Sequence, residues 1–358
     1  MGKSIVRVSA ILVALVILFG FVYTVVMSPK MITRALAPQP PRRVLGATTT
    51  ARAMCTMDLE TGRVFYEHNA DATLPLASTT KIVTAIAVIE TFAEQGKDLD
   101  EKFKINDKAV GIEGTSIYLK KGEELSAREL LFGLMLRSGN DAGVALALLT
   151  KPSVAEFAEV MNKVATRAGA KNSNFKNPHG LDEEGHYTTA SDLAKITIYA
   201  MKNPTFAEIV KTQQTKIDGL EYPRVLHNKN RLLKSLQGCV GVKTGFTKKS
   251  GRCYVAAREV NGQTTVCVVL NCGPMFEEAA TLMTTATEEF PLRHLITVDT
   301  FIDFTSGCAD GICAIAIEDF FYPLSDAELD DIKITLDKEE VVITLKDKEI
   351  YRAECNVI

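Results

Sequence analysis

The stretch "PLASTTKIVTA", Pro75–Ala85, places a hydroxyl and an amine three residues apart, at Ser78 and Lys81. Apolar residues then recur at the spacing of a buried helix face, at Ile82, Val83, Ala85, Ile86 and Ile89. Residues three apart lie on one face of a helix, so the hydroxyl and the amine come within hydrogen-bonding reach. A lysine that is partly desolvated, or beside another cation, can take the proton of a serine. The stretch therefore predicts either a nucleophile with its base or a helix N-terminal serine beside a solvated lysine.

Around this stretch the hydrophobic pattern changes from strands to helices and back to strands. Two short strands joined by a turn begin at Met54 and precede the serine. Helical periodicity follows at Ala127–Leu136, Ala142–Leu149, Val154–Arg167 and Ser191–Met201. Strand patterns return at Cys239–Val242, Arg252–Ala257 and Thr264–Leu270, before a helix at Glu277–Glu289. Helices flanked by sheet from both ends of the chain predict a mixed α/β layer domain, which we assign to residues 51–296.

The last part of the chain, residues 297–358, predicts a small all-β domain. Its segments "IKITL" and "VVITLKDKEIYRAEC" alternate apolar and polar residues, as half-buried strands do. Cys308 and Cys313 bracket "ADGI", and a two-residue hairpin turn there would let the sulfurs face each other in disulfide geometry. Two free, buried thiols are the alternative. The eight cysteines of the chain lack C-x-x-C spacing, so no metal site is expected.

The N-terminal segment, residues 1–27, is predicted to enter a membrane. Val8–Met27 carries no charge over 20 residues and follows two basic residues. The one A-x-A match, Ala35–Ala37, is followed by Pro38, which disfavours cleavage, so an uncleaved anchor is favoured over a removed signal peptide. The proline-rich segment 28–50 then predicts an extended linker. Either reading of the N-terminal segment exports the rest of the chain.

Composition and histidine context exclude two classes of function. The formal net charge of -3 offers no basic footprint for nucleic acid. No G-x-S-x-G is present, and none of the five histidines lies in a recognisable nucleophile-elbow context. A lysine-based mechanism is therefore preferred over a serine–histidine triad.

Two further motifs accompany the serine and lysine. Ser138-Gly139-Asn140 stands in "LMLRSGNDAG", between two helical runs, where a loop could present both polar side chains. Lys243-Thr244-Gly245 follows the apolar strand "CVGV". Each motif alone is compatible with a helix cap or a surface charge. The three together, in this order and context, favour a catalytic site.

With these motifs the chain resembles the serine D-alanyl-D-alanine carboxypeptidases, the low-molecular-mass penicillin-binding proteins. The blocks that carry the resemblance include "MDLETGRVFYEHNADATLPLASTTKIVTA", "NPHGLDEEGHYTTASDLA", "NKNRLL" and "GVKTGFTKKSGRCYVAA". They cover roughly Ala51–Arg293. The resemblance implies a serine β-lactamase/penicillin-binding-protein-like transpeptidase domain followed by a small β domain. It implies no cofactor, and it implies peptidoglycan stem peptides as substrate and β-lactam antibiotics as covalent inhibitors.

The resemblance also implies a role for each motif residue of the catalytic group. Ser78 would attack the carbonyl between the two terminal D-alanines of a stem peptide, and Lys81 would accept its proton. Ser138 would relay protons near the leaving amine. Asn140 would bind a substrate amide and steady the lysine. The backbone N–H groups of Ser78 and Phe246 would form the oxyanion hole.

A second group of residues is implied to bind the substrate carboxylate. Lys243 would add positive potential that attracts the carboxylate, and Thr244 would donate a hydrogen bond to it. Gly245, the third residue of the motif, belongs to the same substrate-binding group. Family members commonly carry an arginine just before the helix that follows the last core strand, and here Met275 occupies that place. Carboxylate recognition is thereby in question, and Arg252 is the candidate substitute.

The two ends of the chain bear on its location, and its motifs are shared by more than one reaction type. The chain stops at Ile358 in strand-like sequence, without the amphipathic C-terminal helix of many members, which favours the N-terminal anchor. We expect the protein at the extracytoplasmic face of a bacterial cell membrane, or secreted if the segment is cleaved.

A D,D-endopeptidase would use the same residues. A serine β-lactamase is disfavoured because no Glu-x-x-x-Asn block is found, and a non-catalytic wall-binding protein is disfavoured because all three motifs are intact.

Overall fold

The computed structural model describes most of the chain beyond the N-terminal segment. The described residues are 42–44, 47–299, 301–303 and 313–357. The expected anchor Val8–Met27, most of the expected linker, and Cys308 of the expected disulfide lie outside them. Within the part of the chain that is described, no helix is both long enough and apolar enough to cross a membrane.

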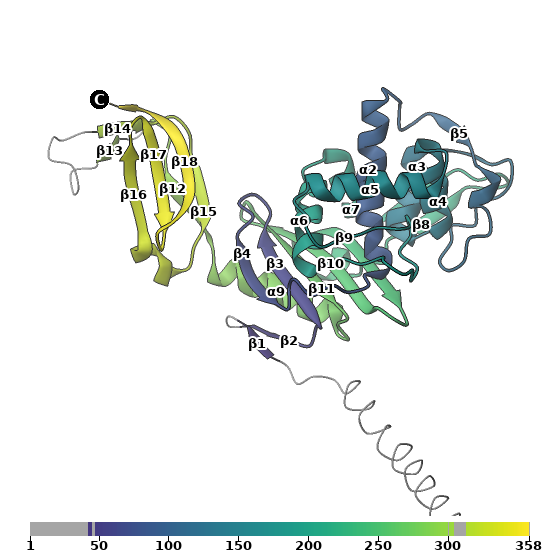
Figure 1. Cartoon of the computed structure of the whole chain (residues 1–358), viewed down its shortest axis with the longest axis horizontal. Helices are drawn as coiled ribbons and strands as arrows, with labels where there is room; N and C mark the ends of the chain where they lie inside the picture. Colours follow the sequence, from purple (N-terminus) through teal and green to yellow (C-terminus); the bar gives the residue numbers. More distant parts are fainter. Residues whose placement is uncertain (1–41, 45–46, 300, 304–312, 358) are drawn as a thin grey trace, which may run out of the picture. The chain divides into compact units, whose positions relative to one another are not determined.

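A five-stranded antiparallel sheet forms the centre of the larger domain (Figure 1). Its strand order is β4-β3-β11-β10-β9. The strands are β3 (Ala53–Asp58), β4 (Val64–His68), β9 (Cys239–Thr247), β10 (Gly251–Val260) and β11 (Gln263–Leu270). The first strands of the domain therefore pair with its last ones, with Cys55 opposite Val268. This arrangement confirms the predicted mixed α/β architecture.

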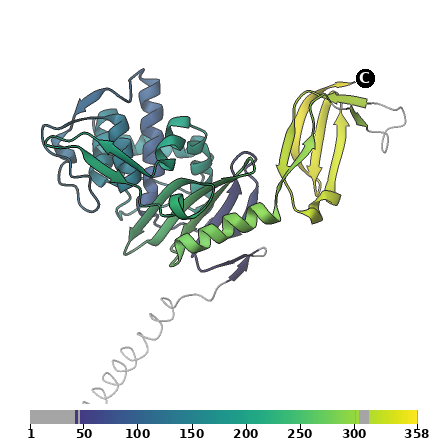
Figure 2. The same ribbon diagram turned by 180° about the vertical axis from the view of Figure 1, so that it is seen from behind.

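Helices cover both faces of this sheet. The middle of the chain supplies α2 (Lys81–Glu94), α3 (Ala127–Phe132), α4 (Asn140–Thr150), α5 (Val154–Arg167), α6 (Ala190–Met201) and α7 (Pro204–Lys211). The other face is covered by α9 (Met275–Glu289), which runs across the sheet in Figure 2. Successive strand residues point to opposite faces. Val255 of β10 accordingly packs in the core shared with the middle helices, while Tyr254 packs against the side of α9.

Short elements complete the larger domain. They are β1 (Arg42–Val44), β2 (Ala47–Thr49), β5 (Lys102–Lys104), β6 (Glu124–Ser126), β7 (Gln214–Ile217), β8 (Arg224–His227) and α8 (Leu232–Ser235). The sequence patterns did not predict the β5–β6 and β7–β8 pairs, which are only three and four residues long and partly exposed. Such strands carry too little alternation to be recognised.

One predicted helix differs from its expected form. The helical pattern at Ala127–Leu136 is an α-helix only to Phe132, and Gly133–Arg137 continues as a π-helical turn. Ser126 caps the start by accepting a hydrogen bond from the Glu129 N–H. The π turn ends at Ser138, whose φ of 66° is left-handed. π-helical turns often occur at functional sites, and this one ends at the serine of the Ser-Gly-Asn motif.

The C-terminal part is all β, as predicted. Its five-stranded sheet has the order β13-β14-β18-β17-β16, and β12 pairs with β15. The strands are β12 (Leu292–Ile296), β13 (Phe301–Asp303), β14 (Cys313–Ala316), β15 (Phe320–Pro323), β16 (Ile332–Asp337), β17 (Glu340–Leu345) and β18 (Lys348–Val357). Its small core gathers Ile296, Ala316, Val341, Ile343 and Cys355.

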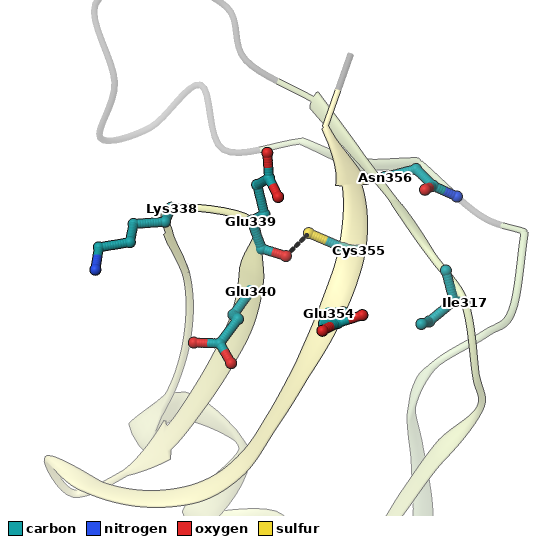
Figure 3. Close-up of a pocket in the computed structure, with 7 residues that line it drawn as sticks. All are labelled: Ile317, Lys338, Glu339, Glu340, Glu354, Cys355 and Asn356. Carbon is teal, nitrogen blue, oxygen red and sulfur yellow. Dashed lines mark hydrogen bonds between the residues drawn. The ribbon is translucent and has the colours of Figure 1, made fainter.

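A cavity of about 640 Å³ lies in this C-terminal part (Figure 3). It is lined by Ile317, Lys338, Glu339, Glu340, Glu354, Cys355 and Asn356. The Cys355 thiol donates to the Glu339 carbonyl at 3.3 Å, and the pKa of this thiol is raised by burial. Among the described residues, no group of three or more histidines, cysteines or carboxylates is arranged to hold a metal.

Candidate active site

Ser78 and Lys81 meet at the start of the central helix α2. Residues Ala77–Thr80 form a 3-10 turn, and Lys81 begins the α-helix. The Lys81 Nζ lies 2.9 Å from the Ser78 Oγ, in hydrogen-bonding contact. In a 3-10 turn, residues three apart eclipse each other, so the two side chains lie closer than in an α-helix. The structure thus brings together the pair that the sequence singled out.

Lys81 is completely buried and has two further oxygen partners. Its Nζ donates to the Asn140 Oδ1 at 2.7 Å and to the His179 carbonyl at 2.6 Å. Burial lowers the pKa of Lys81 well below 10.5, and the positive charges of Lys243 and Lys229 lower it further. A lysine in this setting loses its proton far more readily than one in water. When Lys81 is neutral, the Ser78 hydroxyl can donate to its nitrogen in the same contact.

The Ser-Gly-Asn motif connects the π turn to α4. Asn140 is the first residue of α4, and its Nδ2 donates to the Glu113 carbonyl at 2.7 Å. This contact fixes the amide so that its oxygen faces Lys81. Ser138 is only 4% exposed, and its hydroxyl has no hydrogen bond to a described residue. The Ser138 Oγ therefore takes no part in the hydrogen bonds among the described residues that stabilise the fold.

The Lys-Thr-Gly motif lies on β9, the edge strand of the sheet. Lys243 is 1% exposed and donates to the Thr244 carbonyl at 2.8 Å. Burial, and then the charge of Lys229, lowers the pKa of Lys243 to about 7. A side-chain carbon at Gly245 would lie 3.0 Å from the backbone nitrogen of Ser78. Glycine therefore lets the strand approach the nucleophile turn, backbone against backbone.

Strand alternation divides this motif between two faces of the sheet. Lys243 and Gly245 face the side of the nucleophile, whereas Thr244 and Phe246 face the side of α9. Arg252 of β10 is the register partner of Phe246, so it shares that second face. The Phe246 side chain is 65% exposed at this edge. Thr244, Phe246 and Arg252 thus share one face of the sheet at its β9 edge, and Lys243 lies on the opposite face.

Arg252 and Met275 line one cavity of about 620 Å³. The other lining residues are Arg231, Gly273, Pro274, Phe276 and Glu277. The Arg252 Nη1 donates to the Gly273 carbonyl at 3.0 Å. Arg231 is paired with Glu277 and lies over the Phe276 ring, 4.4 Å from its centroid. Among the described residues, the hydrogen-bond partner of Arg252 is this neutral carbonyl, so its positive charge is not paired with a carboxylate there.

The buried ring of His186 supports the turn that carries Ser78 and is not placed as a base. The Lys176 N–H donates to the His186 Nδ1 at 3.0 Å, so the proton of the neutral ring lies on Nε2. That Nε2 lies 2.8 Å from the Thr80 Oγ1, which donates to the Ala77 carbonyl at 2.8 Å. Burial lowers the pKa of His186 to about 4. This chain of hydrogen bonds supports Ala77, the left-handed residue before Ser78.

Sequence reasoning missed three contributors to the site. The first is the backbone carbonyl of His179, which both Lys81 and, at 3.5 Å, the Ser78 hydroxyl contact. The second is Lys229, whose charge lowers the pKa of both buried lysines. The third is Asp141, whose buried carboxylate opposes that effect on Lys81. All three lie in stretches that the sequence analysis singled out, His179 in "NPHGLDEEGHYTTASDLA", Lys229 in "NKNRLL" and Asp141 in "LMLRSGNDAG", but their residue types did not indicate these contacts.

Comparison with known families gives the family of the chain. The family model of peptidase S11, D-alanyl-D-alanine carboxypeptidase, matches residues 36–273. The chain belongs to the D-alanyl-D-alanine carboxypeptidase family. The carboxypeptidase DacF of Bacillus subtilis is 33% identical to it over 247 residues, which are 69% of this chain and 64% of DacF. The chain therefore covers somewhat less than two thirds of that relative. A carboxypeptidase of Streptomyces strain K15 is 34% identical over 66% of this chain and 85% of its own length.

Solved structures of the carboxypeptidase family agree with this fold. The chain matches a mutant of the Streptomyces K15 DD-transpeptidase with a TM-score of 0.62 at 34% identity, over 66% of this chain and 97% of that one. The carboxypeptidase DacD of Francisella tularensis matches over 91% of this chain and 97% of its own, with a TM-score of 0.74 at 22% identity. The second match shows that the fold similarity extends over most of the chain.

Proposed function

We propose that the chain is a serine D-alanyl-D-alanine carboxypeptidase that removes the terminal D-alanine from peptidoglycan stem pentapeptides. The observation that carries this proposal is the 2.9 Å contact between the Ser78 Oγ and the Nζ of the fully buried Lys81. Membership of the carboxypeptidase family gives the reaction class. The reaction needs no metal and no cofactor.

Acylation begins when neutral Lys81 takes the proton of the Ser78 hydroxyl. The serine oxygen attacks the carbonyl carbon between the two D-alanines, and the negative charge that develops on the carbonyl oxygen is met by the backbone N–H groups of Ser78 and Phe246. The proton then passes through the Ser138 hydroxyl to the leaving amine, and the terminal D-alanine departs. Asn140 binds a substrate amide and holds Lys81 in place.

Deacylation uses the same groups in reverse order. Water attacks the ester on Ser78, and the lysine that accepted the serine proton accepts a proton from the water. The C–O bond of the ester breaks, and the oxygen of Ser78 regains its proton. β-Lactam antibiotics acylate Ser78 as the substrate does, and they remain on it as a slowly hydrolysed acyl-enzyme. Removal of terminal D-alanines limits the cross-linking of the wall, so the protein acts in cell wall maturation.

Arg252 binds the substrate carboxylate in place of the arginine that family members commonly carry at the position of Met275. Its cavity and its position beside Thr244 and Phe246 support this role. We expect Arg252→Gln to raise KM for a D-Ala-D-Ala peptide about tenfold, since a charge-assisted hydrogen bond contributes about 1.5–3 kcal/mol. Michaelis kinetics of D-alanine release would measure this, with Arg231→Gln as the matched control on the same cavity. An equal rise in both variants would contradict the assignment.

The protein acts on the wall from the extracytoplasmic face of a bacterial membrane. The uncharged stretch Val8–Met27 supports an N-terminal anchor for it, with a linker before the catalytic domain. Fractionation of cells that express the full chain would test this location: an anchored protein stays with the membranes, and a cleaved one is found in the medium.

A D,D-endopeptidase that opens wall cross-links is the second candidate. One relative, the D-alanyl-D-alanine endopeptidase of Escherichia coli, is 27% identical over 251 residues. The bond cut and the catalytic group would be the same. Release of D-alanine from pentapeptides, compared with the release of monomers from cross-linked dimers, separates the two reactions.

The deciding experiment is mass spectrometry of the purified protein, as wild type and as Ser78→Ala. Each is mixed with a pentapeptide that ends in D-Ala-D-Ala and, separately, with penicillin. We expect the wild type alone to remove one alanine from the peptide and to gain the mass of one penicillin. An adduct with an intact peptide would favour the endopeptidase. Rapid turnover of penicillin would identify a β-lactamase, and no adduct would favour a non-catalytic wall-binding protein.

A further inference from the structure

The loop that spans residues 113–119 is held firmly against the active site. The Thr115 carbonyl accepts from the Asn140 N–H at 2.7 Å, and the Glu113 carbonyl accepts from the same residue's side chain. The carboxylate of Asp141, 1% exposed, accepts from the Ile117 N–H at 3.0 Å, and also from the Leu119 N–H and the Ser116 hydroxyl. The loop is therefore built as a fixed extension of the catalytic site.

Tyr118 projects from this loop into solvent, and its backbone is strained. Its φ is 62°, although it is not a glycine, and its side chain is 74% exposed. The Tyr118 N–H donates to the Ser116 Oγ at 2.7 Å, and its carbonyl accepts from the Arg224 Nη1 at 3.2 Å. A left-handed tyrosine costs about 1–2 kcal/mol, and this cost is not recovered by burying the ring. Residues held in such strained conformations are often found at active sites and ligand contacts.

A second exposed tyrosine lines the same small cavity as the first. Tyr222, in the turn between β7 and β8, is 72% exposed, and it lines a cavity of about 170 Å³ together with Tyr118. The charged groups of this cavity already have partners. Lys120 pairs with Glu221 at 2.6 Å, and Glu123 pairs with Arg224. The cavity therefore offers two aromatic faces and polar edges, but no unpaired charge for a charged peptide group.

We propose that Tyr118 and Tyr222 bind a sugar ring of the glycan strand to which the stem peptide is attached. This inference rests on the proposed function, since the stem peptide joins the scissile bond to that strand. A sugar ring presents C–H groups to an aromatic face and hydroxyls to the polar edge, which is the chemistry of this cavity. Tyr118 lies three residues, at most about 10 Å of chain, from Thr115 at the active site. A short extended peptide covers such a distance.

The test measures binding to the Ser78→Ala protein, so that no ligand is consumed. The ligands are a free stem pentapeptide and the same pentapeptide on its disaccharide, and calorimetry gives a Kd for each. We expect the disaccharide to lower Kd about tenfold, the sum of two aromatic contacts. Tyr118→Ala combined with Tyr222→Ala should abolish this difference and leave the Kd of the free pentapeptide unchanged. The matched pair Tyr118→Phe and Tyr222→Phe keeps both rings and should keep the preference.

Two results would overturn the sugar contact. One is an equal Kd for both ligands in the protein with both tyrosines present. The other is an equal loss of affinity for both ligands in the double alanine variant, which would assign the tyrosines to the peptide. Cleavage and the penicillin adduct are measured separately on the protein with Ser78 intact. Their absence would refute the proposed function, while the ratio of the two Kd values decides the sugar contact by itself.

Discussion

Replacing Lys81 by methionine is expected to slow the acylation of Ser78 by penicillin about 10⁴-fold at neutral pH. Methionine has nearly the length of lysine and suits a fully buried position, but its thioether cannot accept the serine proton. The variant should remain folded. Removal of a buried amine relieves its desolvation, which offsets the loss of donors to the Asn140 and His179 oxygens. Mass spectrometry over time gives the acylation rate, and thermal unfolding checks the fold.

The matched control for this variant is Lys229→Met. Lys229 is an exposed cation that does not contact Ser78, and its charge lowers the pKa of Lys81. Its removal should raise the pKa of Lys81, so that more of the base is protonated at a given pH. The acid limb of the acylation rate against pH should therefore move to higher pH, with the plateau rate retained. If the Lys81 variant acylates within tenfold of the wild type, another group is the base.

The sequence predicted the contact between Ser78 and Lys81 because its geometry is local. Residues three apart on a helical turn lie on one face, so spacing alone placed Ser78 and Lys81 within reach of each other, although the other two motifs were needed to favour a catalytic reading. The approach of Asn140 is a tertiary contact, and only the resemblance to a known family predicted it. The division of the Lys-Thr-Gly motif between two sheet faces required the strand register, which extends β9 beyond the predicted Val242 to Thr247.

Other parts of the site could not have been predicted from residue types. The carbonyl of His179 contacts Lys81, but every residue has a carbonyl, so the sequence carries no signal for this one. The strained Tyr118 was missed for a similar reason, because left-handed geometry is expected of glycine and asparagine. Site features made by the backbone need the structure, whereas those made by side-chain chemistry leave a pattern in the sequence.

Replacing Gly180 by alanine is expected to reduce both stability and acylation. A side-chain carbon at this position would lie 1.9 Å from the carbonyl oxygen of Ala77, the residue before the nucleophile. The φ of Gly180 is 85°, so the backbone conformation is also unfavourable for alanine. Either the turn that carries the His179 carbonyl or the turn that carries Ser78 must move. We expect unfolding to become easier by about 3 kcal/mol and acylation by penicillin to slow about 100-fold.

Gly185→Ala separates the clash from the backbone strain. Gly185 has a φ of 79°, close to that of Gly180, but a side-chain carbon there would make only ordinary contacts, with the flexible end of Lys176 at 3.4 Å and the Asn174 Nδ2 at 3.6 Å. This control should lose about 1–2 kcal/mol of stability and acylate at the wild-type rate. Chemical denaturation and the acylation rate are measured on both variants. Equal acylation by the two would mean that the contact between Gly180 and Ala77 does not hold Ser78 in place, and that the nucleophile turn is fixed by its own hydrogen bonds.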